Sequence, residues 1–420
     1  MLRVPRSVLI VLAFCLLAAS CYAESGWPAI HGDARNSDTS DLDGAEELSL
    51  AWTRAFDGPI AAAASIHPNG TAWVTVRDAD GPCTLHVIDA ATGADVWCTG
   101  LLSQWVVASS ALIDVAGFAY VADDVAMFKF DPDGNVVWAA PVVGVPISAQ
   151  FTSDNRLFFI THIGRIYVID AISGAVLLMH ELDPGATYVP GTGVSDCLLG
   201  GPACPSANTP SIDLDDDRFY FTWLAPRTTD AVLRAMSYTP GATPAVADLW
   251  TNSTLTGGTA ASPAISLDGT RLYVNDNGGS IHALDAATGA SLWDFDLGAA
   301  AAGSPSVSDA GLVVSTAGGG STLQGVQDTG AAGSSVFDTE DVHRGITVQM
   351  ANEIAYSVVL RDGTLGQLDV VVLDTTDGSE LDRVALGGVP IATVGTSIGP
   401  DGEVVVPGLF GTVYGLLPVA

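Results

Sequence analysis

Short apolar runs separated by turn residues dominate the chain, and the segment Ser262–Gly298 shows this pattern most clearly. Its runs lie at Pro263–Ser266, Arg271–Asn275, Ser280–Asp285 and Ser291–Leu297. Clusters of Asp, Asn, Gly and Thr separate them, and these residue types favour tight turns. The segment therefore predicts one antiparallel sheet of four short strands.

Hairpins like the one at Asp285 recur at a spacing of roughly 40 residues along the chain. They centre on Asp89, Asp131, Asp170 and Asp374, with weaker copies near Tyr238 and Gln327 and a last, partial unit from Val389. Four strands recurring at this period favour a β-propeller among the all-β folds. We expect eight blades, with seven as the alternative, because the last unit lacks its outermost strand.

The missing strand is available near the N-terminus, where Glu47–Phe56 has the pattern of an outermost strand. Pairing the two ends of the chain in one blade would close the ring and protect an open edge. We therefore predict a lead-in segment at 24–46 and a single propeller domain at 47–420. One longer gap between hairpins predicts an insertion at about 183–208.

The first 23 residues have the features of an export signal. Arg3 and Arg6 precede the apolar run Val8–Ala19, which is too short to span a bilayer comfortably. Cleavage after Ala23 fits a small-x-small site, whereas the segment ending at Cys21 resembles a lipobox that would leave this cysteine lipidated. Both endings stay open. We expect a periplasmic or extracellular protein without a transmembrane segment in the mature chain, tethered to the outer membrane if Cys21 is lipidated.

Four cysteines follow the leader, and an even number in an exported chain favours disulfides. Cys83 and Cys98 flank a predicted hairpin almost symmetrically, so a cross-strand bridge is expected. Cys197 and Cys204 lie in the Gly/Pro-rich insertion and are expected to staple it. Neither pair has the spacing and the histidines of a zinc site.

Acidic residues outnumber basic ones by 47 to 15, which gives a formal net charge of −32. Nucleic acid and anionic lipid surfaces repel such a molecule, so neither is expected as a partner. A solvated acidic surface explains the charge more simply than a dedicated cation site. We expect a monomer whose partner is another envelope protein.

One motif recurs in the predicted hairpins. Ala283–Trp293 reads ALDAATGASLW, Val87–Trp97 reads VIDAATGADVW, and Phe130–Trp138 is a shorter copy. This pattern is similar to the tryptophan-docking motif of quinoprotein propellers, and Trp27–Asp33 resembles the lead-in common ahead of them. Over essentially the whole mature chain, the sequence resembles the PQQ-like repeat family.

The resemblance implies a structural role for the motif, in which the tryptophan lies flat against the neighbouring blade. The aspartate accepts hydrogen bonds from turn amides, and the glycine supplies a positive φ angle. The residues expected to act in this way are Asp89, Gly93, Trp97, Trp138, Asp285, Gly289 and Trp293.

The family contains two kinds of protein. Its alcohol-oxidising members bind pyrroloquinoline quinone with calcium and carry a disulfide between adjacent cysteines, which this chain lacks. Its BamB-like members are not enzymes, and the chain resembles them in length and in its minimal loops. We expect a non-catalytic interaction or scaffold propeller of the cell envelope, without cofactor, metal or catalytic residues. A quinone- and calcium-dependent alcohol or sugar dehydrogenase is the alternative.

Other candidate sites have simpler explanations. The carboxylates of Asp213–Asp217 could hold calcium, but they lack the glycine and glutamate of an EF-hand and fit a solvated turn. No Ser/His/Asp set can be assembled from spacing alone. A carbohydrate-binding propeller would require exposed aromatic side chains outside the docking positions, such as Trp105 or Trp223.

Overall fold

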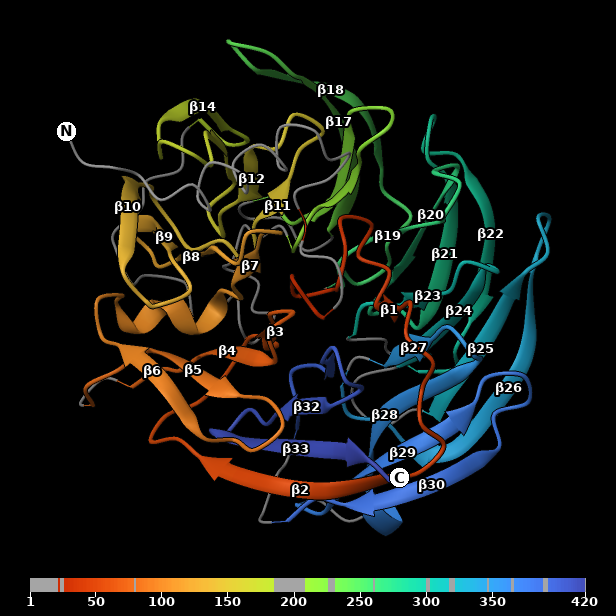
Figure 1. The fold of residues 1–420 in the computed structure, drawn as a ribbon. Helices are drawn as coiled ribbons and strands as arrows, with labels where there is room; N and C mark the ends of the chain where they lie inside the picture. Colours follow the sequence, from red (N-terminus) through yellow and green to blue (C-terminus); the bar gives the residue numbers. More distant parts are fainter. Residues whose placement is uncertain are drawn as a thin grey trace.

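The computed structural model describes most of the chain after the leader. The described residues are 22, 26–78, 81–184, 208–225, 231–259, 261–299, 303–316, 322–345, 347–363, 366–387 and 392–419. Figure 1 shows their strands arranged in sheets around a central axis. Helix within these ranges is limited to two 3₁₀ segments, η1 (Gln104–Ala108) and η2 (Arg361–Gly363).

Eight antiparallel sheets form the blades, which confirms the eight-bladed propeller and excludes the seven-bladed alternative. Blades 1 and 2 consist of β3 (Ser65–Ile66), β4 (Thr71–Thr75), β5 (Leu85–Asp89), β6 (Asp95–Thr99), β7 (Leu112–Ile113), β8 (Ala119–Ala122), β9 (Ala126–Phe130) and β10 (Val136–Pro141). Blades 3 and 4 consist of β11 (Gln150–Phe151), β12 (Leu157–Ile160), β13 (Arg165–Ile169), β14 (Val176–Glu181), β15 (Ser211–Asp213), β16 (Arg218–Trp223), β17 (Val232–Thr239) and β18 (Ala245–Asn252).

The remaining blades repeat the order, with the first strand innermost. Blades 5 and 6 consist of β19 (Ala264–Ile265), β20 (Arg271–Asn275), β21 (Ser280–Asp285), β22 (Ser291–Asp296), β23 (Ser306–Val307), β24 (Leu312–Thr316), β25 (Thr322–Asp328) and β26 (Gly333–Val342). Blades 7 and 8 contain β27 (Val348–Met350), β28 (Ile354–Leu360), β29 (Leu368–Asp374), β30 (Glu380–Ala385), β31 (Ser397–Ile398), β32 (Val404–Pro407) and β33 (Thr412–Pro418).

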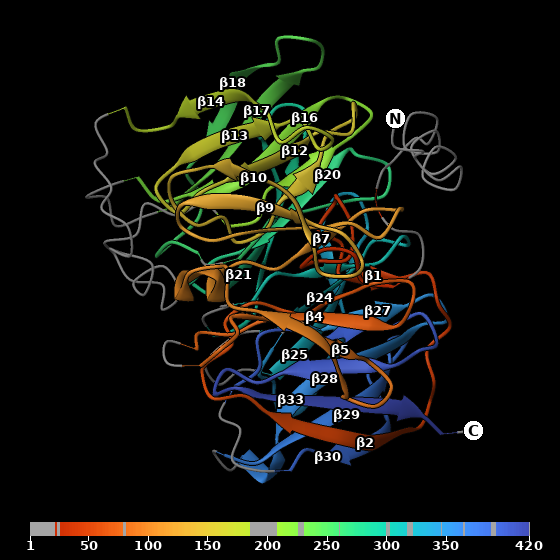
Figure 2. The same ribbon diagram turned by 60° about the vertical axis from the view of Figure 1, so that its left-hand side comes forward.

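Blade 8 is completed by the N-terminal strand β2 (Leu48–Ala55), as the sequence predicts. This strand pairs antiparallel with β33, from Leu48 opposite Pro418 to Ala55 opposite Thr412. Figure 2 shows β2 alongside β33, with β30 of blade 7 nearby. A further short strand, β1 (Thr39–Ser40), adds in parallel to β27 of blade 7, and the pattern of apolar residues did not predict it.

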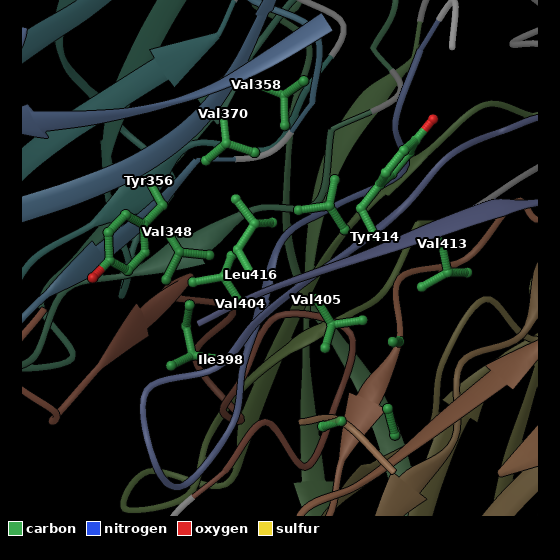
Figure 3. Packing of buried hydrophobic residues seen from close by; sticks show 14 of the residues in the cluster. Val348, Tyr356, Val358, Val370, Ile398, Val404, Val405, Val413, Tyr414 and Leu416 are labelled. Carbon is green, nitrogen blue, oxygen red and sulfur yellow. The ribbon is translucent and has the colours of Figure 1, made fainter. Parts of the chain in front are cut away.

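The core lies between the faces of neighbouring blades. Each inner or middle strand is buried on both faces, so valine, isoleucine and aromatic residues fill these strands. Figure 3 shows this packing between blades 7 and 8, where Tyr356 and Val370 lie on one side and Val404, Tyr414 and Leu416 on the other.

A bulge recurs in the outermost strand of all eight blades. In blade 5, Ala283 pairs with Trp293 and Leu284 pairs with Ser291, so Leu292 has no partner in the ladder. The same one-residue shift occurs at the equivalent position of the other blades. A bulge re-aims the side chains that follow it. Here it turns the next residue toward the neighbouring blade.

That next residue is a tryptophan in five blades, and its ring lies on a glycine of the following blade. A Cβ atom added at the glycine would lie 2.4 to 2.8 Å from the ring. The pairs are Trp52 with Gly93, Trp97 with Gly134, Trp138 with Gly174, Trp250 with Gly289, and Trp293 with Gly333. In three pairs the indole N–H also donates to an alanine carbonyl in that blade's turn: Trp52 to Ala90, Trp138 to Ala171, and Trp250 to Ala286.

The other three junctions use different contacts. Phe337 takes the tryptophan's place between blades 6 and 7, against Gly378. Between blades 3 and 4, Trp223 of blade 4 packs back onto Gly164 of blade 3. Between blades 7 and 8, the carboxylate of Asp382 accepts a hydrogen bond of 2.9 Å from the Leu48 amide.

Substitution of Gly289 tests the junction between blades 4 and 5. Gly289 and Gly298 have φ angles of 71° and 75°, but only Gly289 lies against an indole, since no atom lies within 4 Å of a Cβ at Gly298. Gly298→Ala should cost about 1 kcal/mol through backbone strain alone. Gly289→Ala should cost at least about 2 kcal/mol more, because Trp250 must move. Urea unfolding of both variants measures the difference, and equal losses would rule out the indole contact.

Candidate functional site

The centre of the ring is occupied at one end by the N-terminal segment 26–44, which we call the plug. Figure 1 shows this segment, which includes β1, at the centre of the propeller. We call this end, where the first and second strands of each blade are joined, the plug end. The opposite end, where successive blades are connected, is the loop end.

The plug follows the innermost strands and accepts hydrogen bonds from their amides. Each bond is 2.7 to 3.1 Å long and involves the equivalent residue of its blade. The donors and acceptors are Ile66 to Trp27, Ile113 to Pro28, Ile212 to Ala34, Ile265 to Arg35, Val307 to Ser37, and Gln349 to Asp38. An innermost strand has a free edge, and a buried amide without a partner is costly. The plug therefore satisfies these edges and closes the ring at this end.

A buried polar set fixes the plug to blade 5. The Nε2 atom of His31 lies 3.0 Å from Oγ of Ser262, and its Nδ1 atom lies 2.8 Å from a carboxylate oxygen of Asp38. The three side chains are hydrogen-bonded in the same order as the serine, histidine and aspartate of a hydrolase triad. The spacing of these residues in the sequence did not reveal this set. The three residues are only 0 to 2% exposed, so no substrate can reach the serine. Burial raises the pKa of Asp38, while the neighbouring His31 opposes this effect. The set therefore acts as a structural pin.

A second serine–histidine contact lies between blades 6 and 7. His343 makes a 2.7 Å hydrogen bond with the Ser357 hydroxyl through Nδ1, and its Nε2 atom lies 3.1 Å from Thr339 Oγ1. Ser357 in turn contacts Thr347 at the start of the innermost strand. No carboxylate takes part in these contacts, and His343 is 1% exposed. This arrangement supports packing of the two blades.

The predicted disulfide between Cys83 and Cys98 is present and links β6 to the segment before β5, with the Cα atoms 5.8 Å apart. Closing a loop of this size stabilises a chain by about 3 kcal/mol in the chain-entropy account. Cys197 and Cys204, and with them most of the 183–208 insertion, lie outside the described residues, as does Cys21.

The remaining predicted residues lie in turns or at the junctions. Asp89 and Asp285 each accept hydrogen bonds from the threonine three residues later, so they hold the turns against which Trp52 and Trp250 pack. Asp213 accepts bonds from the amides of Asp215 and Asp216, as in an ordinary turn. Trp223 is buried, whereas Trp105 is partly exposed and lies under the guanidinium of Arg77.

Sequence reasoning missed two of the docking tryptophans, Trp52 and Trp250. Trp250 follows a hairpin turn that has lost the Asp-x-x-x-Gly pattern, so the motif does not extend to it. The signal that could have found both is a tryptophan near the end of each predicted outermost strand.

The cavities in the described ranges can be tested against a quinone cofactor. Four of them have volumes of about 340 to 460 Å³. Pyrroloquinoline quinone carries three carboxylates, which favour cationic partners in a binding site. The arginines that line these cavities are Arg271, Arg361 and Arg383, and each is paired with aspartate. The residues around these cavities do not fit the cofactor.

Two searches of the described ranges concern metals and membranes. No three His, Cys, Asp or Glu side chains there form a group that could hold a metal ion. None of the helical segments in the same ranges has the length and apolar character that crossing a bilayer requires.

Comparison with known proteins gives the family. The family model described as outer membrane protein assembly factor BamB matches residues 42–191 and 242–405. The chain belongs to this family. A relative named Protein Rv3035, from Mycobacterium tuberculosis (strain ATCC 25618 / H37Rv), is 31% identical over 403 residues, which cover 94% of this chain and 96% of the relative.

Solved structures of BamB-family and quinoprotein propellers share the fold. BamB from Moraxella catarrhalis superposes with a TM-score of 0.60 at 14% identity, covering 88% of this chain and all of BamB. Quinohemoprotein alcohol dehydrogenase from Comamonas testosteroni superposes with a TM-score of 0.65 at 13% identity, covering 97% of this chain and 83% of the enzyme. The two likenesses show the propeller fold and do not choose between the two functions.

The buried histidine His343 predicts a dependence of stability on pH. Burial, with a smaller effect of Arg383, lowers the pKa of His343 from 6.5 to about 3. Between these values the unfolded chain binds the extra proton, so the free energy of unfolding falls as the pH falls below 6.5. From pH 7 to pH 5 this residue should account for a loss of about 2 kcal/mol.

The variant His343→Gln isolates this contribution. Urea unfolding of both proteins at pH 7 and pH 5 should show a smaller loss on acidification in the variant, because glutamine does not titrate. Other buried histidines contribute equally to both proteins and cancel in the difference. Identical losses in the two proteins would show that His343 is not the group responsible.

Proposed function

We propose that the chain is an exported, non-catalytic interaction propeller of the cell envelope that serves in protein assembly, as its BamB family description suggests. The observation that carries the proposal is the asymmetry of the ring. The plug covers one end of the central axis, where its carbonyls accept hydrogen bonds from amides of the innermost strands. The loop end is therefore the surface on which a partner can dock.

The chemistry of the loop end supports this choice. Connections on a rigid scaffold are where binding residues concentrate, and this end carries the connections between blades. Leu101 and Phe410 are exposed apolar side chains at this end, although Leu267 and Ile172 at the plug end are exposed to a similar extent. The net charge of −32 disfavours an anionic membrane surface as the docking partner, and we therefore propose a protein.

The dehydrogenase alternative has less support. It rests on the shared propeller fold, since the arginines that line the cavities are already paired with carboxylates. Export through the N-terminal leader belongs to the proposal, and the final position of the chain at the outer membrane or in solution depends on how this leader is processed.

Photo-crosslinking from opposite ends of the ring tests the docking surface. A photoreactive residue is placed at Leu101 or Phe410 on the loop end, or at Leu267 or Ile172 on the plug end. All four side chains are 57 to 63% exposed, so accessibility is matched. In the native envelope, the loop-end positions should give a defined crosslinked protein and the plug-end positions should not. Crosslinking only from the plug end would reverse the assignment.

Equilibrium dialysis tests the enzymatic alternative directly. The purified chain is dialysed against pyrroloquinoline quinone with calcium, and bound quinone is measured by its absorbance. We expect no uptake at a concentration of tens of micromolar, because the arginines that line the four described cavities are already paired with aspartate. Stoichiometric uptake that requires calcium would instead support the dehydrogenase.

A further inference from the structure

Tyr22 takes part in closing the ring, although it precedes the plug. Its hydroxyl accepts a hydrogen bond of 3.0 Å from the amide of Phe151 and donates a short one to the side chain of Gln150. Its ring packs edge-on against Phe151, with the centroids 5.2 Å apart. Both partners belong to β11, the innermost strand of blade 3.

This contact extends a series to seven of the eight blades. The plug carbonyls satisfy the equivalent amides of blades 1, 2, 4, 5, 6 and 7, and Phe151 holds the same position in blade 3. The plug serves blade 2 through the Pro28 carbonyl and blade 4 through the Ala34 carbonyl. In blade 3, the acceptor of the equivalent amide is the Tyr22 hydroxyl instead of a plug carbonyl. Phe151 is 1% exposed, so water is a poor substitute for the lost acceptor.

We infer that the mature chain retains Tyr22, and that processing of the exported protein cuts the chain ahead of this residue and not after Ala23. The inference rests on the proposed export. The cut is a hydrolysis, in which water adds to the peptide carbonyl and leaves a carboxylate on the leader and an amine on the mature chain. The Ser20–Cys21 bond, at the end of the lipobox-like segment, meets this requirement, whereas cleavage after Ala23 removes the blade 3 contact.

The position of Tyr22 also orients the molecule. The chain enters the propeller at the plug end, because Tyr22 contacts β11 where this strand leads into its plug-end turn. Any membrane anchor upstream of Tyr22 therefore holds the plug end toward the membrane. The loop end, proposed above as the docking surface, then faces away from it.

The mature N-terminus gives the direct test. The protein is expressed in its native host with its own leader, purified from the envelope fraction, and examined by intact mass and N-terminal peptide mapping. We expect a chain that begins at or before Tyr22, whether or not Cys21 carries lipid. A chain that begins at Glu24 overturns the inference and leaves the proposed export intact. An uncut chain confined to the cytoplasm contradicts both.

Hydrogen exchange tests the contact itself. The variant Tyr22→Phe keeps the ring and removes the hydroxyl, so the Phe151 amide should exchange at least ten-fold faster than in the unmodified protein. The control is Tyr356→Phe, whose hydroxyl bonds to Ala45 beyond the plug, and it should leave the Phe151 rate unchanged. An unchanged rate in Tyr22→Phe would show that the tyrosine does not protect this strand.

Discussion

The fold depends on how each blade meets the next. A one-residue bulge in the outermost strand turns the following side chain out of the ladder, and in five blades an indole then lies on a glycine of the neighbouring turn. The glycine is required because a Cβ atom would overlap the ring. Since the bulge recurs in all eight blades, successive blades meet in a similar way. The ring can therefore close, with β2 joining the two ends of the chain in blade 8.

Closure of the ring creates a second requirement at its centre. Eight innermost strands present edges to the axis, and their buried amides need acceptors. The plug supplies main-chain carbonyls to six of these strands at one end, and the pin formed by His31, Asp38 and Ser262 fixes it there. The two ends of the propeller consequently differ: the plug end is engaged by the chain's own N-terminal segment, and the loop end carries the connections between blades. The proposed function follows from this difference.

The sequence predicts most of the repeating features and the Cys83–Cys98 disulfide, and it misses the contacts of the plug. The recurring apolar runs and the hairpin motif predict the eight blades. The strand pattern at Glu47–Phe56 predicts how the ring closes in blade 8. The plug contacts have no sequence signature, because main-chain carbonyls make them. The pin joins residues 231 positions apart, so spacing could not reveal it. Trp250 was missed because its hairpin has lost the motif, although its indole sits at a junction like the others.

Amide hydrogen exchange resolved to single residues tests the closed centre most directly. In the purified mature protein, the account predicts slow exchange for the matching amides of the innermost strands, among them Ile66, Ile113, Ile212, Ile265 and Val307. Their rates should be comparable to those of the middle strands. Exchange at the rate of a solvent-exposed strand edge would contradict the account, because the plug would then not close the ring.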